Sequence, residues 1–299
     1  MANRSVALVN RSKRDFSEVR RVAAAIQRQV LQDFGPTWGH TGAVIALEQD
    51  EPLPAGYSAV YLYDALEDPR LSGIHYYTAR GEIYANVAVN KEPWSLSASH
   101  EVLEMIVDPT TDWKRSAPSL RAGQGTVEYL VEVCDPCQHF AFSYNIDGVV
   151  VSDFYGPNYF DSFNSGPGRY SMTGAVKRPL QILAGGYLSW RDSNGVWWRG
   201  VANGSGTVSS DRISGFENLP GDSIREKIDF YSSTLASVGC TIPLGRKYQK
   251  LLAQKERELR AQQKNLQKFG AQRQAEQEAH HQTVLATIGS FDERLRNLA

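Results

Sequence analysis

One short segment carries residues whose types and spacing suit metal binding. Residues 97–109 read SASHEVLEMIVDP, in which His100 and Glu104 are one helical turn apart. On a helix, side chains four positions apart lie on one face, so both can bind the same ion. Glu101 is displaced by one position and leans over the coordination position that these two leave open. The alternative is an ordinary helix with a solvated acidic face of Glu101, Glu104 and Asp108.

A second acidic segment, VEYLVEVCDPC at 127–137, follows the first. In a strand Glu128 and Glu132 share a face, and in a helix Asp135 joins them. Glu132 stands between two valines, where an unpaired carboxylate is costly. We therefore expect a metal ion or a cationic partner beside Glu132.

The same segment offers a competing metal site. Cys134 and Cys137 have the spacing of a zinc knuckle, and His139 is a third candidate ligand. A structural zinc normally needs a second pair, and the remaining cysteine is Cys240. Structural or incidental thiols, a redox-sensitive pair or local disulfide, and metal ligands all stay open. Three cysteines suit no disulfide framework, which agrees with a reducing compartment.

Hydrophobic periodicity predicts the elements that position these residues, in an α+β fold. Ser95 or Ser97 is the expected N-cap of the motif helix. The helix that begins near residue 15 is expected to end at Gly35-Pro36. The predicted elements are strands at 5–11, 42–49 and 57–65, a hairpin or bent strand at 73–90, helices at 15–35, 95–108 and 222–239, a loop at 110–126 and a β-rich region at 127–202.

The order strand, helix, three strands and motif helix resembles the catalytic domains of zincin metallopeptidases, over roughly residues 5–110. In that family a twisted mixed sheet lies over a backing helix, and the active-site helix carries His-Glu-x-x-His. The resemblance implies a zinc ion bound by His100 and Glu104. It also implies that Glu101 is the general base, which accepts a proton from the water that attacks a carbonyl.

A third protein ligand is required, and in the gluzincin subset it is a Glu some 20 or more residues after the motif. The resemblance therefore favours Glu132, with Asp135 as the second choice or as the carboxylate that orients His100. Glu104 replaces a histidine, which adds negative charge and weakens the Lewis acidity of the metal. The metzincin pattern is absent, because Val107 and Thr110 stand where it needs Gly and His.

Other residues suggest weaker roles. His75, on a strand near the expected cleft, is a structural histidine or a group that holds an oxyanion. His40 is expected to be structural. Further oxyanion candidates are Tyr129, Tyr155 and Tyr159. The group Trp190, Trp197 and Trp198 predicts cross-strand packing in a hairpin, with an aromatic binding platform as the alternative. No Gly-x-Ser-x-Gly elbow, phosphate loop or Gly-x-Gly-x-x-Gly turn occurs.

Residues 246–299 differ in composition from residues 1–240, which form the expected zincin-like domain. They are rich in Gln, Lys, Arg, Glu and Ala, and their apolar residues follow a narrow seam that is typical of helix pairing. A helical or coiled-coil arm for self-association or docking is expected, and a helix folded back onto its own domain is the alternative. The seam residues are Tyr248, Leu252, Leu259, Leu266, Phe269, Val284, Ile288, Phe291, Leu295 and Leu298.

Composition narrows the class of protein. The net charge of −1 favours neither nucleic acid nor an anionic membrane as a partner. No secretory signal and no run of 18 apolar residues occur, so a soluble cytoplasmic protein is expected. The leading hypothesis is a zinc-dependent hydrolase of peptide or amide bonds that acts on a peptide or protein substrate. The alternative is a non-catalytic structural protein, in a phage particle or a bacterial multiprotein assembly, on a zincin-like scaffold.

Overall fold

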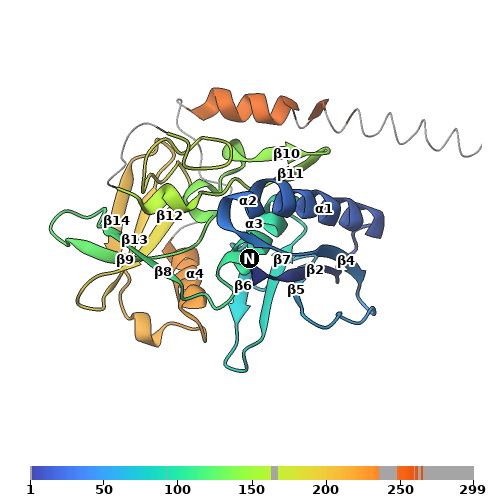
Figure 1. The fold of residues 1–299 in the computed structure, drawn as a ribbon, viewed down its shortest axis with the longest axis horizontal. Coiled ribbons are helices and arrows are strands. Elements are labelled where there is room, and N and C mark those ends of the chain that lie inside the picture. Colours follow the sequence, from blue (N-terminus) through green and yellow to red (C-terminus); the bar gives the residue numbers. More distant parts are fainter. Residues whose placement is uncertain are drawn as a thin grey trace, which may run out of the picture. The chain divides into compact units, whose positions relative to one another are not determined.

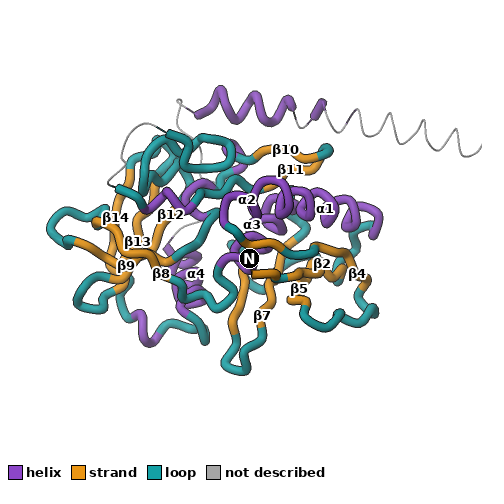
Figure 2. Tube along the Cα trace, viewed as in Figure 1, coloured by secondary structure: helices purple, strands orange, loops and turns teal. Residues whose placement is uncertain are grey.

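The chain forms a mixed α+β fold with several sheets and few helices, seen in a computed structural model (Figures 1 and 2). The structure describes residues 2–91, 93–162, 168–235, 248–258, 260, 261 and 264. These residues include two five-stranded sheets and two two-stranded ones. The expected α+β class is confirmed, while the likeness to zincins stays a prediction.

The first five-stranded sheet is built from the N-terminal strands. Four of its strands, β4, β2, β5 and β7, are parallel to one another, and the edge strand β6 runs antiparallel to β7. Alternate residues of β2 face opposite sides, so Leu8 joins the main core while Val9 joins a smaller cluster on the other face. In spatial order the strands are β4 (Val44–Glu48), β2 (Ser5–Asn10), β5 (Tyr57–Tyr63), β7 (Ile83–Ala88) and β6 (Gly73–Tyr77).

The first helix is longer than the sequence indicated. Helix α1 (Phe16–Gln29) continues through a π-helical turn, η1 (Val30–Phe34), into α2 (Gly35–Trp38). The predicted end at Gly35-Pro36 was wrong, because Pro36 occupies the first turn of α2, where a missing N–H costs nothing. The helix ends instead at Gly39, whose φ of 71° supplies the left-handed cap.

Helix α3 (Trp94–Val107) carries the motif and confirms the helix predicted at 95–108. Its N-cap is Pro93, so the predicted serine cap was wrong. Ser95 lies inside the helix and donates a hydrogen bond to the carbonyl oxygen of Val150 over 2.7 Å. Every residue of α3 except Ser97 is buried, because α3 packs against β6, β7 and β11 (Val149–Val151). The motif is therefore an interior element.

The second five-stranded sheet is antiparallel. The segment predicted as a loop at 110–126 contains its edge strand β8, whose pairing with β9 overrides a sequence poor in strand-forming residues. The hairpin predicted from the tryptophan group is confirmed, with Trp190 directly opposite Trp198. In spatial order the strands are β14 (Val208–Arg212), β13 (Trp197–Ala202), β12 (Tyr187–Arg191), β9 (Thr126–Leu130) and β8 (Lys114–Pro118).

Shorter elements join the two sheets. The predicted β-rich region at 127–202 contains a short hairpin at 144–151, where Asp147 and Gly148 adopt positive φ at the turn. Helix α4 (Ile224–Leu235) packs against β6 and lies beside the antiparallel sheet in Figure 1. The remaining elements are β1 (Ala2–Asn3), β3 (His40–Thr41), β10 (Tyr144–Ile146), β11 (Val149–Val151) and the 3₁₀ turns η2 (Asp135–Cys137), η3 (Phe140–Phe142), η4 (Pro157–Phe160) and η5 (Phe216–Asn218).

Both five-stranded sheets contribute to one hydrophobic core. Leu8 of the first sheet, Leu103 of α3 and Trp190 of the second sheet belong to the same buried cluster. Residues 1–252 accordingly form one compact unit, and residues 253–299 form another. The site helix thus lies within a single core.

The expected C-terminal arm lies mostly outside the described residues. Two of its seam residues are described, and both belong to the first compact unit. Tyr248 packs edge-on against Phe142 with ring centroids 5.6 Å apart, and Leu252 contacts the cluster of Ala141 and Ala184. At its start, therefore, the seam packs against the chain's own domain.

We predict that Trp190→Ala destabilises the protein by about 3–5 kcal/mol, the usual cost of removing a large buried aromatic side chain. Trp190 is fully buried, packs against Tyr129 at 5.6 Å and donates a hydrogen bond to Gln124. Urea unfolding followed by far-UV circular dichroism measures the change. Trp198→Ala is the matched control, because Trp198 is only partly buried and should cost less. Equal costs for both variants would contradict this role in the core.

Candidate metal centre

The three polar residues of the motif lie in the interior of the protein. The side chains of His100, Glu101 and Glu104 are 10%, 4% and 0% exposed. Asp108, at the C-cap of α3, is buried as well. The alternative of a solvated acidic face is therefore wrong, since these carboxylates need partners inside the fold.

His100 and Glu104 meet as their spacing predicts. Nε2 of His100 lies 3.1 Å from Oε2 of Glu104 and 3.3 Å from Oδ1 of Asp135. The backbone N–H of Cys134 donates a hydrogen bond to Oε1 of Glu104 over 3.1 Å, which fixes that carboxylate. A nitrogen of His100, an oxygen of Glu104 and the Sγ of Cys134 all lie within 4.8 Å of one another. Three ligand types suited to zinc therefore converge here.

The edge strand β6 adds a histidine from the other side of Glu104. Nδ1 of His75 lies 3.1 Å from Oε2 of Glu101 and 3.9 Å from Oε2 of Glu104. A Cβ on Gly73 would approach Oε1 of Glu101 to 2.5 Å, so glycine at this position leaves room for the carboxylate. His75 thus belongs to the site, where the sequence suggested only a structural or oxyanion-holding residue.

Arg225 of α4 is the central residue that the sequence reasoning missed. Its guanidinium lies 2.6 Å from Glu132, 3.0 Å from Asp135 and 3.3 Å from Glu104. It also pairs with Asp229 over 2.8 Å, one helical turn along α4. The expectation that Glu132 needs a metal or a cationic partner is met here by the cation.

A weak sequence signal for Arg225 did exist. Arg225 follows Ile224 and precedes Ile228 by three positions, and these two isoleucines pack into one apolar cluster. An arginine beside the apolar stripe of a helix, with an acidic residue four positions later, indicates a buried ion pair. The partners of that pair, however, lie about 90 residues away in the chain.

Burial and crowding set the protonation states of these groups. Burial lowers the pKa of His100, but Glu104 and Asp135 outweigh it and hold that pKa well above its ordinary value. Burial raises the pKa of Glu132 well above its usual range. Arg225 lowers that pKa, but the nearby negative charges of Glu104 and Asp135 raise it further.

Glu104 and Asp229 shift in opposite directions. Burial favours the neutral form of Glu104, but His100 and Arg225 overcome it and keep the pKa of Glu104 below its usual range. Burial raises the pKa of Asp229 to about 6, even though Arg225 lowers it. The site thus favours the charged form of Glu104 and the neutral form of Asp229, and a charged carboxylate suits a metal ligand.

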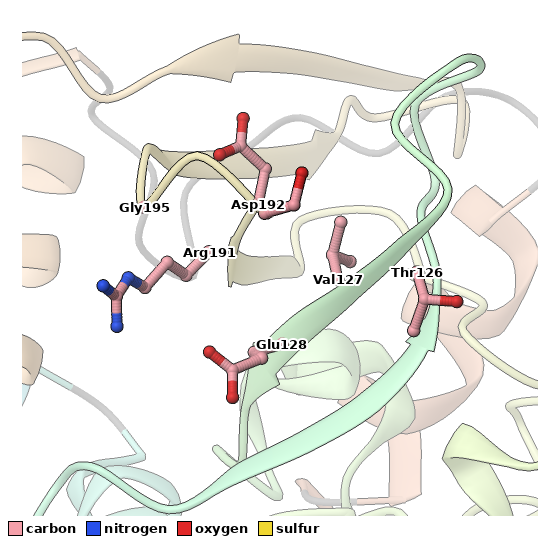
Figure 3. A pocket seen from close by; sticks show the side chains of 7 residues that line it. Thr126, Val127, Glu128, Arg191, Asp192 and Gly195 are labelled. Atoms are coloured by element: carbon pink, nitrogen blue, oxygen red, sulfur yellow. The ribbon is translucent and has the colours of Figure 1, made fainter.

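Not every predicted ligand joins the converging groups. Glu132 lies in the cluster, but Arg225 holds it. Asp135 lies near the same nitrogen of His100 that Glu104 meets, but it is in neither group of converging ligand atoms. Glu128 is exposed on β9, opposite Arg191 in register, and lines a surface pocket of about 230 Å³ (Figure 3). The grouping of Glu128 with Glu132 was wrong, because β9 ends at Leu130 and the chain then turns inward.

The candidate ligands of the Cys-x-x-Cys segment have different surroundings in the structure. Cys134 and Cys137 are free and buried, and burial raises both thiol pKa values well above their ordinary range. Cys134 faces the motif, whereas Nδ1 of His139 accepts a hydrogen bond from the backbone of Ala141. The structure thus places one of these thiols with the His-Glu motif. Cys240 lies outside the described residues.

The oxyanion candidates among the tyrosines have structural surroundings. The hydroxyl of Tyr129 donates to the carbonyl oxygen of Pro118, and that of Tyr159 donates to the carbonyl oxygen of Gln181. Tyr155 is fully buried and stacks on Tyr159 at 4.1 Å. These contacts indicate core packing for all three tyrosines.

Comparisons with known proteins found no match, so the interpretation of the site rests on its geometry. No protein-family model, no curated protein and no solved structure matches the chain. Among the described residues, no helix has both the length and the apolar character that crossing a membrane requires.

We predict that Arg225→Met destabilises the protein by about 3–5 kcal/mol, because it leaves Glu132, Asp135 and Asp229 buried without their cation. Chemical denaturation monitored by circular dichroism measures the loss. The matched control is Arg115→Met on the exposed edge strand β8, which should change stability little. Equal stability of Arg225→Met and wild type would show that the cluster does not depend on this guanidinium.

Proposed function

We propose that this protein binds a divalent cation, zinc in the first instance, at His100, Glu104 and Cys134, and that the site serves hydrolysis of a peptide or amide bond. The observation that carries the proposal is the convergence of these three ligand atoms on one buried point. Asp135 stands next to the same nitrogen of His100 and is the candidate for a fourth ligand.

The separations between the groups suit a metal. Zinc bonds nitrogen at about 2.0–2.1 Å and carboxylate oxygen at about 2.0–2.2 Å in a tetrahedral arrangement, which sets neighbouring ligands roughly 3.3 Å apart. The corresponding distances from Nε2 of His100 are 3.1 and 3.3 Å. Oε2 of Glu104 is buried and lacks a partner in hydrogen-bond geometry, although nitrogens of His100 and Arg225 lie near it. A cation at this point would satisfy that oxygen.

The residues around the site have distinct tasks in the proposed reaction. A bound zinc ion would polarise a carbonyl and acidify water. Glu101 lies 3.1 Å from His75 and, unlike the other four carboxylates of the cluster in the described part of the chain, forms no ion pair with Arg225. It is the carboxylate that accepts a proton from the attacking water. The backbone of Cys134 keeps Glu104 oriented. Because His100 is the most exposed of these side chains, entry to the site is expected on its side.

The first test of the proposal is metal content. We predict that wild-type protein retains zinc after desalting and that His100→Ala loses zinc bound at this site, because His100 supplies its ligand nitrogen. Elemental analysis of purified full-length chain measures this. His40→Ala is the control, since His40 of the short strand β3 is in neither group of converging ligand atoms, and it should keep the wild-type content. Absence of zinc from wild type after zinc reconstitution would sink the proposal.

Hydrolysis is tested separately from binding. We predict that Glu101→Gln keeps at least one zinc ion per chain yet loses peptide hydrolysis by about 10²-fold or more, since an amide cannot accept the proton. Turnover of a fluorogenic peptide library by zinc-loaded wild type and variant measures the effect. A Glu101→Gln variant that hydrolyses peptides at the wild-type rate would refute the role of Glu101 and leave the ion site standing.

A second candidate function is a non-catalytic structural role in an assembly. The observation that favours it is the position of Arg225, whose guanidinium forms ion pairs with four buried carboxylates. These ion pairs stabilise the fold and need neither a metal ion nor a catalysed reaction. Under this alternative the C-terminal segment carries the function.

The structural role predicts that the full-length chain is oligomeric and that a chain ending at Gly245 is monomeric, because truncation removes the apolar seam. Size-exclusion chromatography with light scattering distinguishes the two states. Circular dichroism of both chains provides the control that truncation leaves the fold intact. A monomer in both cases would remove the assembly argument.

A further inference from the structure

Two groups of converging ligand atoms share one carboxylate. The first comprises His100, Glu104 and Cys134, and the second comprises His75, Glu101 and Glu104. Within each group the ligand atoms lie within 4.8 Å of one another. Oε2 of Glu104 lies 3.1 Å from the nitrogen of His100 and 3.9 Å from the nitrogen of His75. One carboxylate oxygen therefore stands between two histidines.

We propose that the site is dinuclear, with a second divalent ion bound by His75 and by Oε2 of Glu101, and with Glu104 bridging the two ions. Oε1 of Glu101 then stays available as the proton acceptor. This inference rests on the proposed function, because Glu104 must already hold the first ion. Ions bridged by a carboxylate in two-metal hydrolytic sites lie about 3.5–4 Å apart, and two histidines flanking one carboxylate suit that spacing.

Charge balance supports two ions better than one. Among the described residues, five buried carboxylates form the cluster, and Arg225 contacts four of them. Ligation requires neutral histidines, so His75 and His100 then contribute no positive charge. When all five carboxylates are charged, they exceed Arg225 by four negative charges, and the buried Asp108 and Arg199, which also interact with these carboxylates, cancel each other. Two divalent ions offset that excess and one does not. The carboxylates are Glu101, Glu104, Glu132, Asp135 and Asp229.

Local geometry also favours an ion at the second position. The separation of 3.1 Å between Nδ1 of His75 and Oε2 of Glu101 matches that of neighbouring zinc ligands, roughly 3.3 Å. Gly73 supplies the space for Glu101, and any larger residue would push the carboxylate away from His75. Oε2 of Glu104, which both groups share, has no partner in hydrogen-bond geometry. The second position is thus built by β6 and α3 together.

The experiment counts ions per chain. Full-length protein is stripped with a chelator, reconstituted with Zn²⁺, desalted and analysed for zinc against protein concentration, and the same series is run with Co²⁺ and its absorption spectrum. We expect two ions per wild-type chain, one in His75→Ala and two in His40→Ala. Gly73→Ala is the second variant, because it displaces Glu101 while leaving every ligand in the sequence, and it should also drop to one.

The outcomes separate this inference from the proposed function. One ion per wild-type chain, unchanged in His75→Ala and lost in His100→Ala, overturns the second site and leaves the first. No ion in wild type overturns both. Circular dichroism establishes that each variant is folded, and if His75→Ala and Gly73→Ala both unfold, the wild-type count of two or one still decides.

Discussion

The structure depends on one constraint, the burial of more negative than positive charge between a helix and two sheets. A carboxylate moved out of water needs a cation, a proton or several hydrogen-bond donors. Glu104 and Glu132 are at most 4% exposed, and Arg225 is the guanidinium that reaches both. Without a bound ion, the remaining negative charge favours protonation, as the raised pKa of Glu132 and of Asp229 indicates. Whatever fills the cluster therefore also holds the fold together.

This constraint explains the arrangement of elements around α3. A helix buried on all sides normally carries only apolar residues, yet α3 carries His100, Glu101 and Glu104. Its apolar residues join the main core, while the polar ones face the turn at Asp135, the edge strand β6 and α4. Three separate parts of the chain thus meet at one helix face. Apolar residues of equal volume often stabilise a core as well as buried ion pairs do. Buried charged residues at this position therefore suit ligand binding or a unique packing arrangement better than stability alone.

The sequence predicted the local part of this design and missed the long-range part. Spacing alone placed His100 and Glu104 together, and the valines around Glu132 correctly required a partner for it. Strand β8 was missed because its pairing with β9, more than its own residues, makes it a strand. The grouping of Glu128 with Glu132 failed because no local pattern marks where β9 ends. Arg225 lies about 90 residues from Asp135, and periodicity does not report which helix meets which turn.

Proton, guanidinium and metal ion are alternatives for the same place. The distances around His100 suit a protonated imidazole between carboxylates as well as a metal between ligands, since about 3 Å separates the heavy atoms in both cases. A terminal nitrogen of Arg225 lies 3.3 Å from Glu104 and 3.4 Å from Asp135, where an ion would also stand between these carboxylates. Binding of a cation at this place would require His100 to lose its proton and the guanidinium of Arg225 to move toward Glu132 and Asp229. Arg225 and Asp229 lie one turn apart on α4, so a bound cation at this place would couple metal binding to the stability of that helix.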